Sequence, residues 1–186
     1  MQPKPVLFTV VGVSFSEPRF AFDVVVPRDD STLFTGFAGV LPAVTAMENH
    51  GETYDHVGDS RTVRLSDGGT FREEIVRYVR PHGVVDANPP PGEASTGHFD
   101  YDVTTFTGLL SHIVSDATAR WTYAPGTTGR THITWAYAYR PLPGRTFVVR
   151  RLIGPLWMRY MRRSMRNVLA AIVDERRAGT PEPEGA

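Results

Sequence analysis

The chain has 186 residues, no cysteine, and 20 acidic and 20 basic residues. This length predicts one domain with a single core, which we expect to span residues 1–178, followed by a disordered tail at 179–186. The lack of cysteine excludes disulfides, thiolate nucleophiles and cysteine-ligated metals. A formal net charge of zero argues against nucleic acid as a partner.

The sequence also predicts an ordinary soluble protein. No apolar run approaches the roughly 20 residues of a membrane helix, and the N-terminus lacks a signal-peptide pattern. We therefore expect a cytoplasmic protein without stable membrane insertion, either a monomer or a homodimer. All basic residues except Lys4 are arginine, which indicates GC-rich bacterial coding and carries no mechanistic weight.

The chain begins with a predicted strand at residues 6–15, which is rich in β-branched and aromatic side chains. Residues 16–26 fit two interpretations. Ser16 is a suitable N-cap, with Glu17 and Pro18 as the first residues of a short helix, but Val24 to Val26 also favours a strand. A second short helix is expected at residues 31–36.

Most of the remaining chain has the alternating pattern of antiparallel strands, joined by turns such as Ser66-Asp67-Gly68-Gly69. The proline-rich residues 86–97 predict a solvated loop, and residues 108–116 are interpreted as a loop that crosses an opening. The predicted strands are residues 44–49, 58–65, 70–79, 99–106, 117–123 and 131–140.

The last element is a long helix within residues 146–177, in which apolar residues recur at spacings of three and four. Six arginines lie mostly on its opposite side. We interpret them as a solvated surface, with attraction to a membrane or an anionic partner as the less favoured alternative. The six are Arg150, Arg151, Arg159, Arg162, Arg163 and Arg166.

These elements predict an α+β fold with a curved antiparallel sheet of about seven strands around one long C-terminal helix, and two short helices after the first strand. Such a sheet encloses a cavity where it curves away from the helix.

Several local motifs occur in an order that resembles the SRPBCC superfamily, which has the START-like helix-grip fold. They are the FxFDxxVP pattern at residues 20–27, VGDSRTVRLSDG at 57–68, Glu73, Arg80-Pro81, FDYDV at 99–103, the hairpin at 117–141 and the final helix. The resemblance spans about residues 6–175 and favours a helix at 17–26. A departure is the PPPG segment before FDYDV, which would remodel one rim of the cavity.

The resemblance implies a cavity for apolar or aromatic small molecules, and in some members cyclisation or dehydration of polyketide-like chains. Our leading hypothesis is therefore binding of a hydrophobic, polyketide- or lipid-like molecule. The alternative is a cofactor-independent polyketide cyclase or dehydratase. A third possibility is an interaction protein that acts through its surface, because a fold does not fix a function.

Arg61 and Glu73 are the first candidate site residues. Each shares its strand's alternation with apolar neighbours, so both are expected to face inward as a buried ion pair or as a charged end of the cavity. A purely structural salt bridge is the favoured alternative to a catalytic role. With Tyr101, they are our candidate catalytic residues.

Aromatic residues alternate along several strands and would line an apolar pocket with hydroxyl and indole donors, or simply fill the core. The predicted ligand-binding residues are Trp121, Tyr123, Trp135, Tyr137, Trp157, Tyr160 and Met161. Tyr139 continues the same alternation.

Other polar residues give weaker signals. The six histidines show no metal-ligand spacing, so we expect no metal and no cofactor. His50, His56, Tyr54 and Glu48 lie near an expected cavity mouth, but a general acid or base there is disfavoured. Asp100 and Asp102 are expected to face water.

Overall fold

The computed structural model describes residues 3–26, 42–82 and 96–179. The second short helix expected at 31–36, most of the proline-rich segment and the expected tail from residue 180 lie outside these residues. Within them, no helix is long and apolar enough to cross a membrane.

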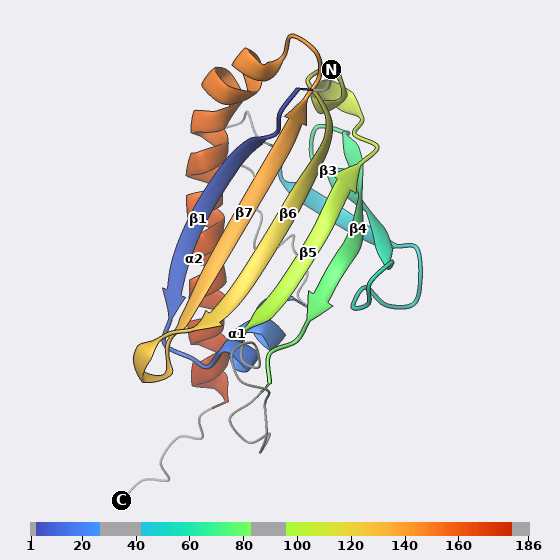
Figure 1. Ribbon diagram of the computed structural model, residues 1–186. Helices are drawn as coiled ribbons and strands as arrows, with labels where there is room; N and C mark the ends of the chain where they lie inside the picture. The colour runs from blue at the N-terminus through green and yellow to red at the C-terminus, as the bar shows by residue number, and fades with distance from the viewer. Residues whose placement is uncertain (1–2, 27–41, 83–95, 180–186) are drawn as a thin grey trace, which may run out of the picture.

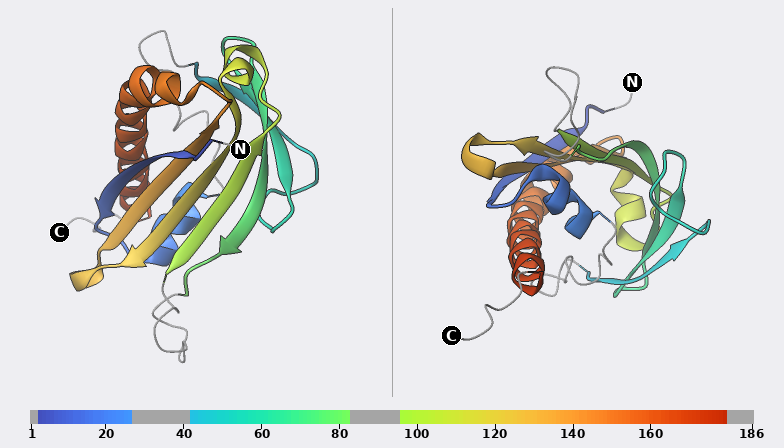
Figure 2. Two further views of the ribbon diagram at one scale, coloured as in Figure 1. Left: turned by 45° about the horizontal axis from the view of Figure 1, so that its top comes forward. Right: turned by 90° about the horizontal axis from the view of Figure 1, so that it is seen from below.

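The fold is built on one antiparallel sheet with the strand order β1-β7-β6-β5-β4-β3-β2. The sheet bends into an arc, and the long helix α2 runs along its open side (Figures 1 and 2). Chain order and sheet order differ only because β1 pairs with β7, which brings the two ends of the domain together. The strands are β1 (Val6–Ser14), β2 (Val44–Asn49), β3 (Ser60–Leu65), β4 (Thr70–Val79), β5 (Gly97–Thr104), β6 (Val114–Pro125) and β7 (Thr131–Pro141).

Two helices and three short helical turns complete the described part of the chain. Helix α1 (Pro18–Val25) follows β1, which settles the ambiguous segment as a helix. The turn η2 (Gly108–His112) precedes β6, and η3 (Thr127–Gly129) connects β6 to β7. A π-helical turn, η4 (Val148–Ile153), leads directly into α2 (Gly154–Ala178).

Helix α2 packs closely on β1 because two glycines let side chains and backbone approach. A Cβ atom at Gly12 would lie 2.7 Å from the Met165 sulfur. A Cβ atom at Gly154 would lie 2.9 Å from the Phe8 ring. The apolar face of α2 thus meets the concave face of the sheet, as the three- and four-residue spacing predicts.

The end of the sheet near α1 is densely packed with aromatic rings. Phe22 of α1 makes edge-to-face contacts with Tyr78 and Tyr123, with ring centroids 5.4 and 5.2 Å apart. The Trp121 and Trp135 rings stack at 4.8 Å next to this cluster. These contacts fill the concave side at this end with protein rather than space.

The expected fold class is confirmed: the sheet has seven antiparallel strands and the C-terminal helix is long. Three local expectations were wrong. The N-cap of α1 is Glu17, because the Ser16 hydroxyl instead hydrogen-bonds that of Ser14 at 2.7 Å. The segment at 108–116 is the turn η2 and the start of β6, not a loop across an opening.

The third error concerns Asp100, which is buried rather than exposed to water. It occupies the face of β5 opposite to that of Phe99 and Tyr101, as alternation predicts. However, Arg120 of the neighbouring strand β6 lies over it and donates a hydrogen bond of 2.9 Å to its carboxylate. Cross-strand pairing has therefore covered a side chain that the strand pattern alone places at the surface.

Candidate functional site

A pocket of about 270 Å³ lies between the sheet and the N-terminal part of α2. This volume is close to the lower end of the roughly 300–1,000 Å³ of small-molecule sites. Its wall is mainly aliphatic and aromatic, and its carboxylates are Asp67 and Glu73. The aromatic residues on the wall are Phe71, Tyr101, Phe106, Trp135, Tyr137, Tyr139, Trp157 and Tyr160.

Two small residues of β6 lie between tyrosines of the pocket wall, although no β6 residue lines the pocket itself. Ala119 lies between Tyr101 of β5 and Tyr137 of β7 in the cross-strand register. One step along, Ala117 lies between Val103 and Tyr139. Because an alanine side chain is a single methyl group, these positions leave room beside the tyrosine rings, whereas the larger Trp121 occupies the equivalent position nearer to α1.

Trp157 of α2 stands at the centre of the aromatic wall. Its ring stacks on Tyr160 at 5.0 Å and meets the edges or faces of Tyr137 and Tyr139 at 5.0 and 5.3 Å. Its Nε1 atom is buried and has no hydrogen-bond partner among the described residues. An unsatisfied buried N–H costs about 1–3 kcal/mol, so a ligand acceptor at this position would be favoured.

Tyr137 and Tyr139 remain neutral hydrogen-bonding groups. Burial raises the pKa of both phenols well above the usual value of 10.0. The nearby Tyr139 and Tyr101 hydroxyls and the Glu73 carboxylate raise the pKa of Tyr137 further. A phenolate is thus disfavoured in this wall, where Tyr137 and Tyr139 hydrogen-bond each other as neutral hydroxyls.

Arg61 and Glu73 lie directly opposite each other on β3 and β4 and form a buried ion pair. The Arg61 Nε and Nη2 atoms lie 2.7 and 2.6 Å from Glu73 Oε2, and both side chains are only 7% exposed. The guanidinium also stacks over the Tyr54 ring, 4.2 Å from its centroid. Glu73 lines the pocket and Arg61 does not, so the arginine holds the carboxylate at the wall from behind.

No protein-family model and no curated protein matches the sequence, but solved structures match the fold. Zhui aromatase/cyclase from Streptomyces sp. R1128 aligns with a TM-score of 0.64 at 12% identity, over 96% of this chain and 100% of that one. Ara h 8.0201 aligns with a TM-score of 0.62 at 13% identity, over 92% and 99%. Norcoclaurine synthase from Thalictrum flavum, in complex with dopamine and hydroxybenzaldehyde, gives 0.60 at 14% identity, over 97% and 91%.

The chain has the helix-grip fold of these structures. The resemblance inferred from the sequence motifs is therefore confirmed at the level of the fold, which is what likenesses at 12–14% identity establish.

The helix-grip pocket brings together six of the ten residues predicted for a site. They are Glu73, Tyr101, Trp135, Tyr137, Trp157 and Tyr160. Trp121, Tyr123 and Met161 are buried in the core and do not line the pocket. The physical reason is their position: Trp121 and Tyr123 belong to the packed cluster near α1, and Met161 is fully enclosed on α2.

Several wall residues were not predicted. Phe71 was expected to face inward with Glu73 but was not included among the predicted ligand-binding residues. Phe106 and Leu110 come from the connection between β5 and β6, where no period of two or 3.6 is long enough to predict which side chains point inward.

The histidines near the β2–β3 connection are occupied by structural contacts. His50 places its two ring nitrogens 3.0 and 2.8 Å from the hydroxyls of Ser60 and Thr62. Neither His50 nor His56 lines the helix-grip pocket. These two histidines therefore lie outside the pocket wall.

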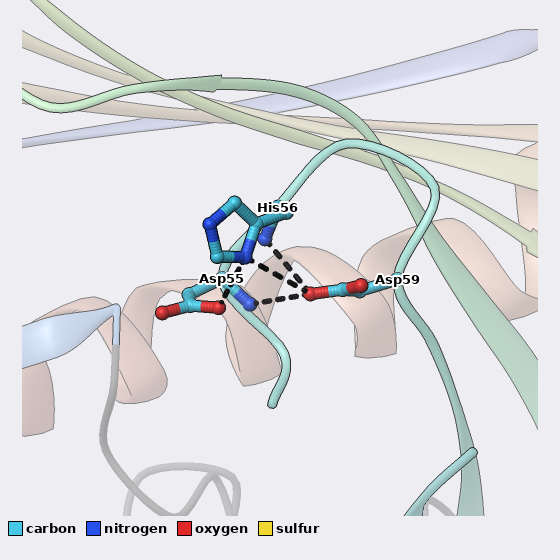
Figure 3. A group of neighbouring side chains, drawn as sticks. All are labelled: Asp55, His56 and Asp59. Atoms are coloured by element: carbon cyan, nitrogen blue, oxygen red, sulfur yellow. Dashed lines mark hydrogen bonds and ion pairs between the residues drawn. The ribbon is translucent and has the colours of Figure 1, made fainter. Parts of the chain in front are cut away.

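Asp55, His56 and Asp59 form an exposed cluster on the same connection (Figure 3). Asp59 Oδ2 accepts the backbone N–H groups of Asp55 and His56 at 3.0 and 2.9 Å. These bonds hold the pKa of Asp59 below its usual value. His56 Nδ1 lies 2.7 Å from an Asp55 carboxylate oxygen. We interpret the cluster as a turn stabilised by its own carboxylate.

Proposed function

We propose that this protein binds a flat hydrophobic or aromatic small molecule, polyketide- or lipid-like, in the pocket between the sheet and α2. The observation that carries the proposal is an apolar pocket with eight aromatic residues on its wall and few charges. Flat rings are suited to such walls because stacked and edge-to-face contacts contribute beyond simple area burial.

The polar groups of the wall narrow the ligand chemistry. Trp157 supplies a buried N–H, and the neutral phenols of Tyr137 and Tyr139 supply further hydrogen-bonding groups. We infer that the ligand carries an acceptor such as a carbonyl or phenol oxygen. The helix-grip structures of an aromatase/cyclase and of norcoclaurine synthase with dopamine and hydroxybenzaldehyde support an aromatic ligand by analogy of fold.

A pocket-filling substitution tests the proposal. Leu156 lines the pocket, so Leu156→Trp should occupy its space and weaken binding of a flat aromatic probe, 8-anilinonaphthalene-1-sulfonate, by about tenfold or more. Val173 is an exposed residue of the same helix, and Val173→Trp is the matched control. Equal probe affinity in the two variants and the parent would refute binding in this pocket.

A second experiment addresses the inferred acceptor. Trp157→Phe keeps the aromatic wall and removes the N–H, so it should reduce affinity for a carbonyl-bearing aromatic ligand more than for the corresponding hydrocarbon. Native mass spectrometry of the freshly purified protein, followed by organic extraction, would identify a natural ligand to use in this comparison. Equal losses for both ligands would remove Trp157 as a donor.

The alternative function is a cyclase or dehydratase in the same cavity, and the cluster of Glu73, Tyr101 and Tyr137 favours it. Glu73 would orient a polar group of the substrate, and Arg61 would hold Glu73 in position. The acidic carbon between two ketones would lose a proton to water and add to the reacting carbonyl, while Tyr101 gives its proton to the carbonyl oxygen and regains one from water. The hydroxyl formed in this way would then leave as water together with a second hydrogen of that carbon. Tyr101→Phe should then abolish loss of water from a linear poly-β-ketone thioester analogue, followed by mass spectrometry, without reducing its binding. Tyr78→Phe is a control away from the pocket wall.

A further inference from the structure

The C-terminal third of the chain has a strongly asymmetric charge distribution, although the net charge of the protein is zero. Between Asp116 and Asp174 there are ten arginines and no acidic residue. This stretch includes most of β6, then β7, η4 and nearly all of α2. The positive charges therefore gather on the elements that build one side of the pocket.

Apolar side chains protrude at the mouth of this pocket. Leu109 of η2 and Leu152 of η4 both line the pocket, yet they are 71% and 59% exposed. Phe147, one residue before η4, is 69% exposed and does not line the pocket. The two turns lie at the same end of the molecule (Figures 1 and 2), where Leu142 N–H donates a hydrogen bond of 2.9 Å to the Ile113 carbonyl.

Three exposed arginines accompany these apolar residues. Arg145 precedes η4, and Arg150 and Arg151 lie within it. None of the three has a carboxylate within 4.0 Å among the residues that the structure describes. Two acidic residues of this part of the fold make other contacts: Asp116 pairs with Arg140 at 3.0 Å, and Asp67 accepts the Gly69 N–H at 2.9 Å.

We propose that this rim, defined by Leu109, Phe147 and Leu152 with Arg145, Arg150 and Arg151, docks on an anionic lipid surface. The apolar side chains would enter the boundary between headgroups and acyl chains, while the arginines would contact lipid phosphates. This is the pairing of groups that holds proteins at a membrane interface without spanning it.

A bilayer is favoured over an acidic protein by the position of the rim. Two of the three protruding apolar residues, Leu109 and Leu152, belong to the pocket wall, so docking would give an apolar molecule a water-free path between the hydrocarbon layer and the pocket. Exposed charge alone would attract either partner, but it does not explain leucines at 71% and 59% exposure on the wall of the opening.

Co-sedimentation of the full chain with phospholipid vesicles tests the proposal without any pocket ligand. Binding is expected to phosphatidylcholine vesicles containing about one-third phosphatidylglycerol, to weaken with added salt, and to be slight with pure phosphatidylcholine. Arg150→Gln/Arg151→Gln should lower the partition coefficient about 25-fold, roughly five-fold for each arginine. Phe147→Ser should lower it as well.

Matched controls separate docking at the rim from diffuse attraction. Arg162 and Arg163 are equally exposed on α2 beyond the rim, so Arg162→Gln/Arg163→Gln should change partitioning less than about two-fold. Val57 is an exposed apolar residue on the β2–β3 connection, and Val57→Ser should have no effect.

Equal losses in the two arginine pairs would overturn the proposal in favour of non-specific charge. Absence of binding to the anionic vesicles would also overturn the proposal, and an acidic protein would then be the favoured partner of the rim. Because Phe147, Arg150 and Arg151 do not line the pocket, probe binding in these variants should be unchanged. Failure of docking is thereby distinguished from failure of the proposed ligand binding.

Discussion

Removing one partner of the Arg61–Glu73 ion pair should destabilise the fold strongly. Both side chains are 7% exposed and their atoms lie 2.6–2.7 Å apart, so Arg61→Leu would leave a buried carboxylate at the pocket wall without its cation. Breaking a buried pair in this way costs about 3–5 kcal/mol. For a domain of this size, that corresponds to a fall in Tm of about 6–20 °C.

The double variant Arg61→Leu/Glu73→Leu provides the decisive comparison. It replaces both charges by apolar groups, which is often neutral, so we expect its cost to be within about 2 kcal/mol and well below the sum of the single variants. Urea unfolding followed by tryptophan fluorescence and far-UV circular dichroism measures all the free energies. Arg64→Leu, which breaks the neighbouring but exposed Arg64–Glu48 pair, is the matched control and should leave the midpoint nearly unchanged.

A loss below about 1 kcal/mol in Arg61→Leu, or simple additivity of the single variants, would refute this reasoning. A large loss also changes how activity assays must be designed. Alanine variants of either residue would confuse unfolding with loss of a chemical role, so Glu73→Gln and Tyr101→Phe are better tests of chemistry.

Two further predictions follow from burial and close packing. Because burial raises the folded-state pKa of Tyr137 and Tyr139 above their unfolded value of 10.0, only the unfolded chain releases these protons as the pH rises past 10. The two tyrosines should therefore leave the free energy of unfolding unchanged below about pH 9 and lower it above about pH 10, by about 1.4 kcal/mol per pH unit for each tyrosine. The urea midpoint of Tyr137→Phe/Tyr139→Phe should fall less steeply with pH than that of the parent protein. An unchanged slope would contradict the prediction. Gly97→Ala should cost about 1–3 kcal/mol in thermal or urea unfolding, because its Cβ would lie 2.5 Å from Pro81 Cγ and 3.0 Å from the Phe22 ring. Gly51→Ala, whose Cβ would meet nothing nearer than 4.0 Å, is the control, and equal stability of the two variants would disprove the close contact.

Strand alternation and turn residues were sufficient to predict most of the sheet. The strands at 44–49 and 70–79 were predicted to the residue; the second begins after the turn Ser66-Asp67-Gly68-Gly69 and ends at Arg80-Pro81. The same alternation placed Arg61 and Glu73 on one inward face, where the structure shows them in direct register. For an antiparallel hairpin, the turn fixes which residues face each other, so the pairing can be read before the fold is known.

The alternation of side chains along a strand could not distinguish residues of the pocket wall from residues of the packed core. Trp121 and Trp135 are cross-strand partners with the same inward orientation, yet only Trp135 lines the pocket. The difference depends on what lies above each ring, namely α1 and Phe22 at one end and open space at the other. That distinction arises from contacts between elements distant in the chain, which a single sequence does not display.

Ala117 and Ala119 bear on the size of the pocket more than on the packed end of the domain. Neither alanine takes part in the ring contacts of Phe22, Trp121 and Tyr123, although all of them belong to the same buried core. Neither alanine lines the pocket itself, so a larger side chain there would change the chamber by displacing the neighbouring wall residues Tyr137 and Tyr139. Two positions on one strand thus provide a simple route by which descendants of this chain could change the size of the molecule they accept and still fold.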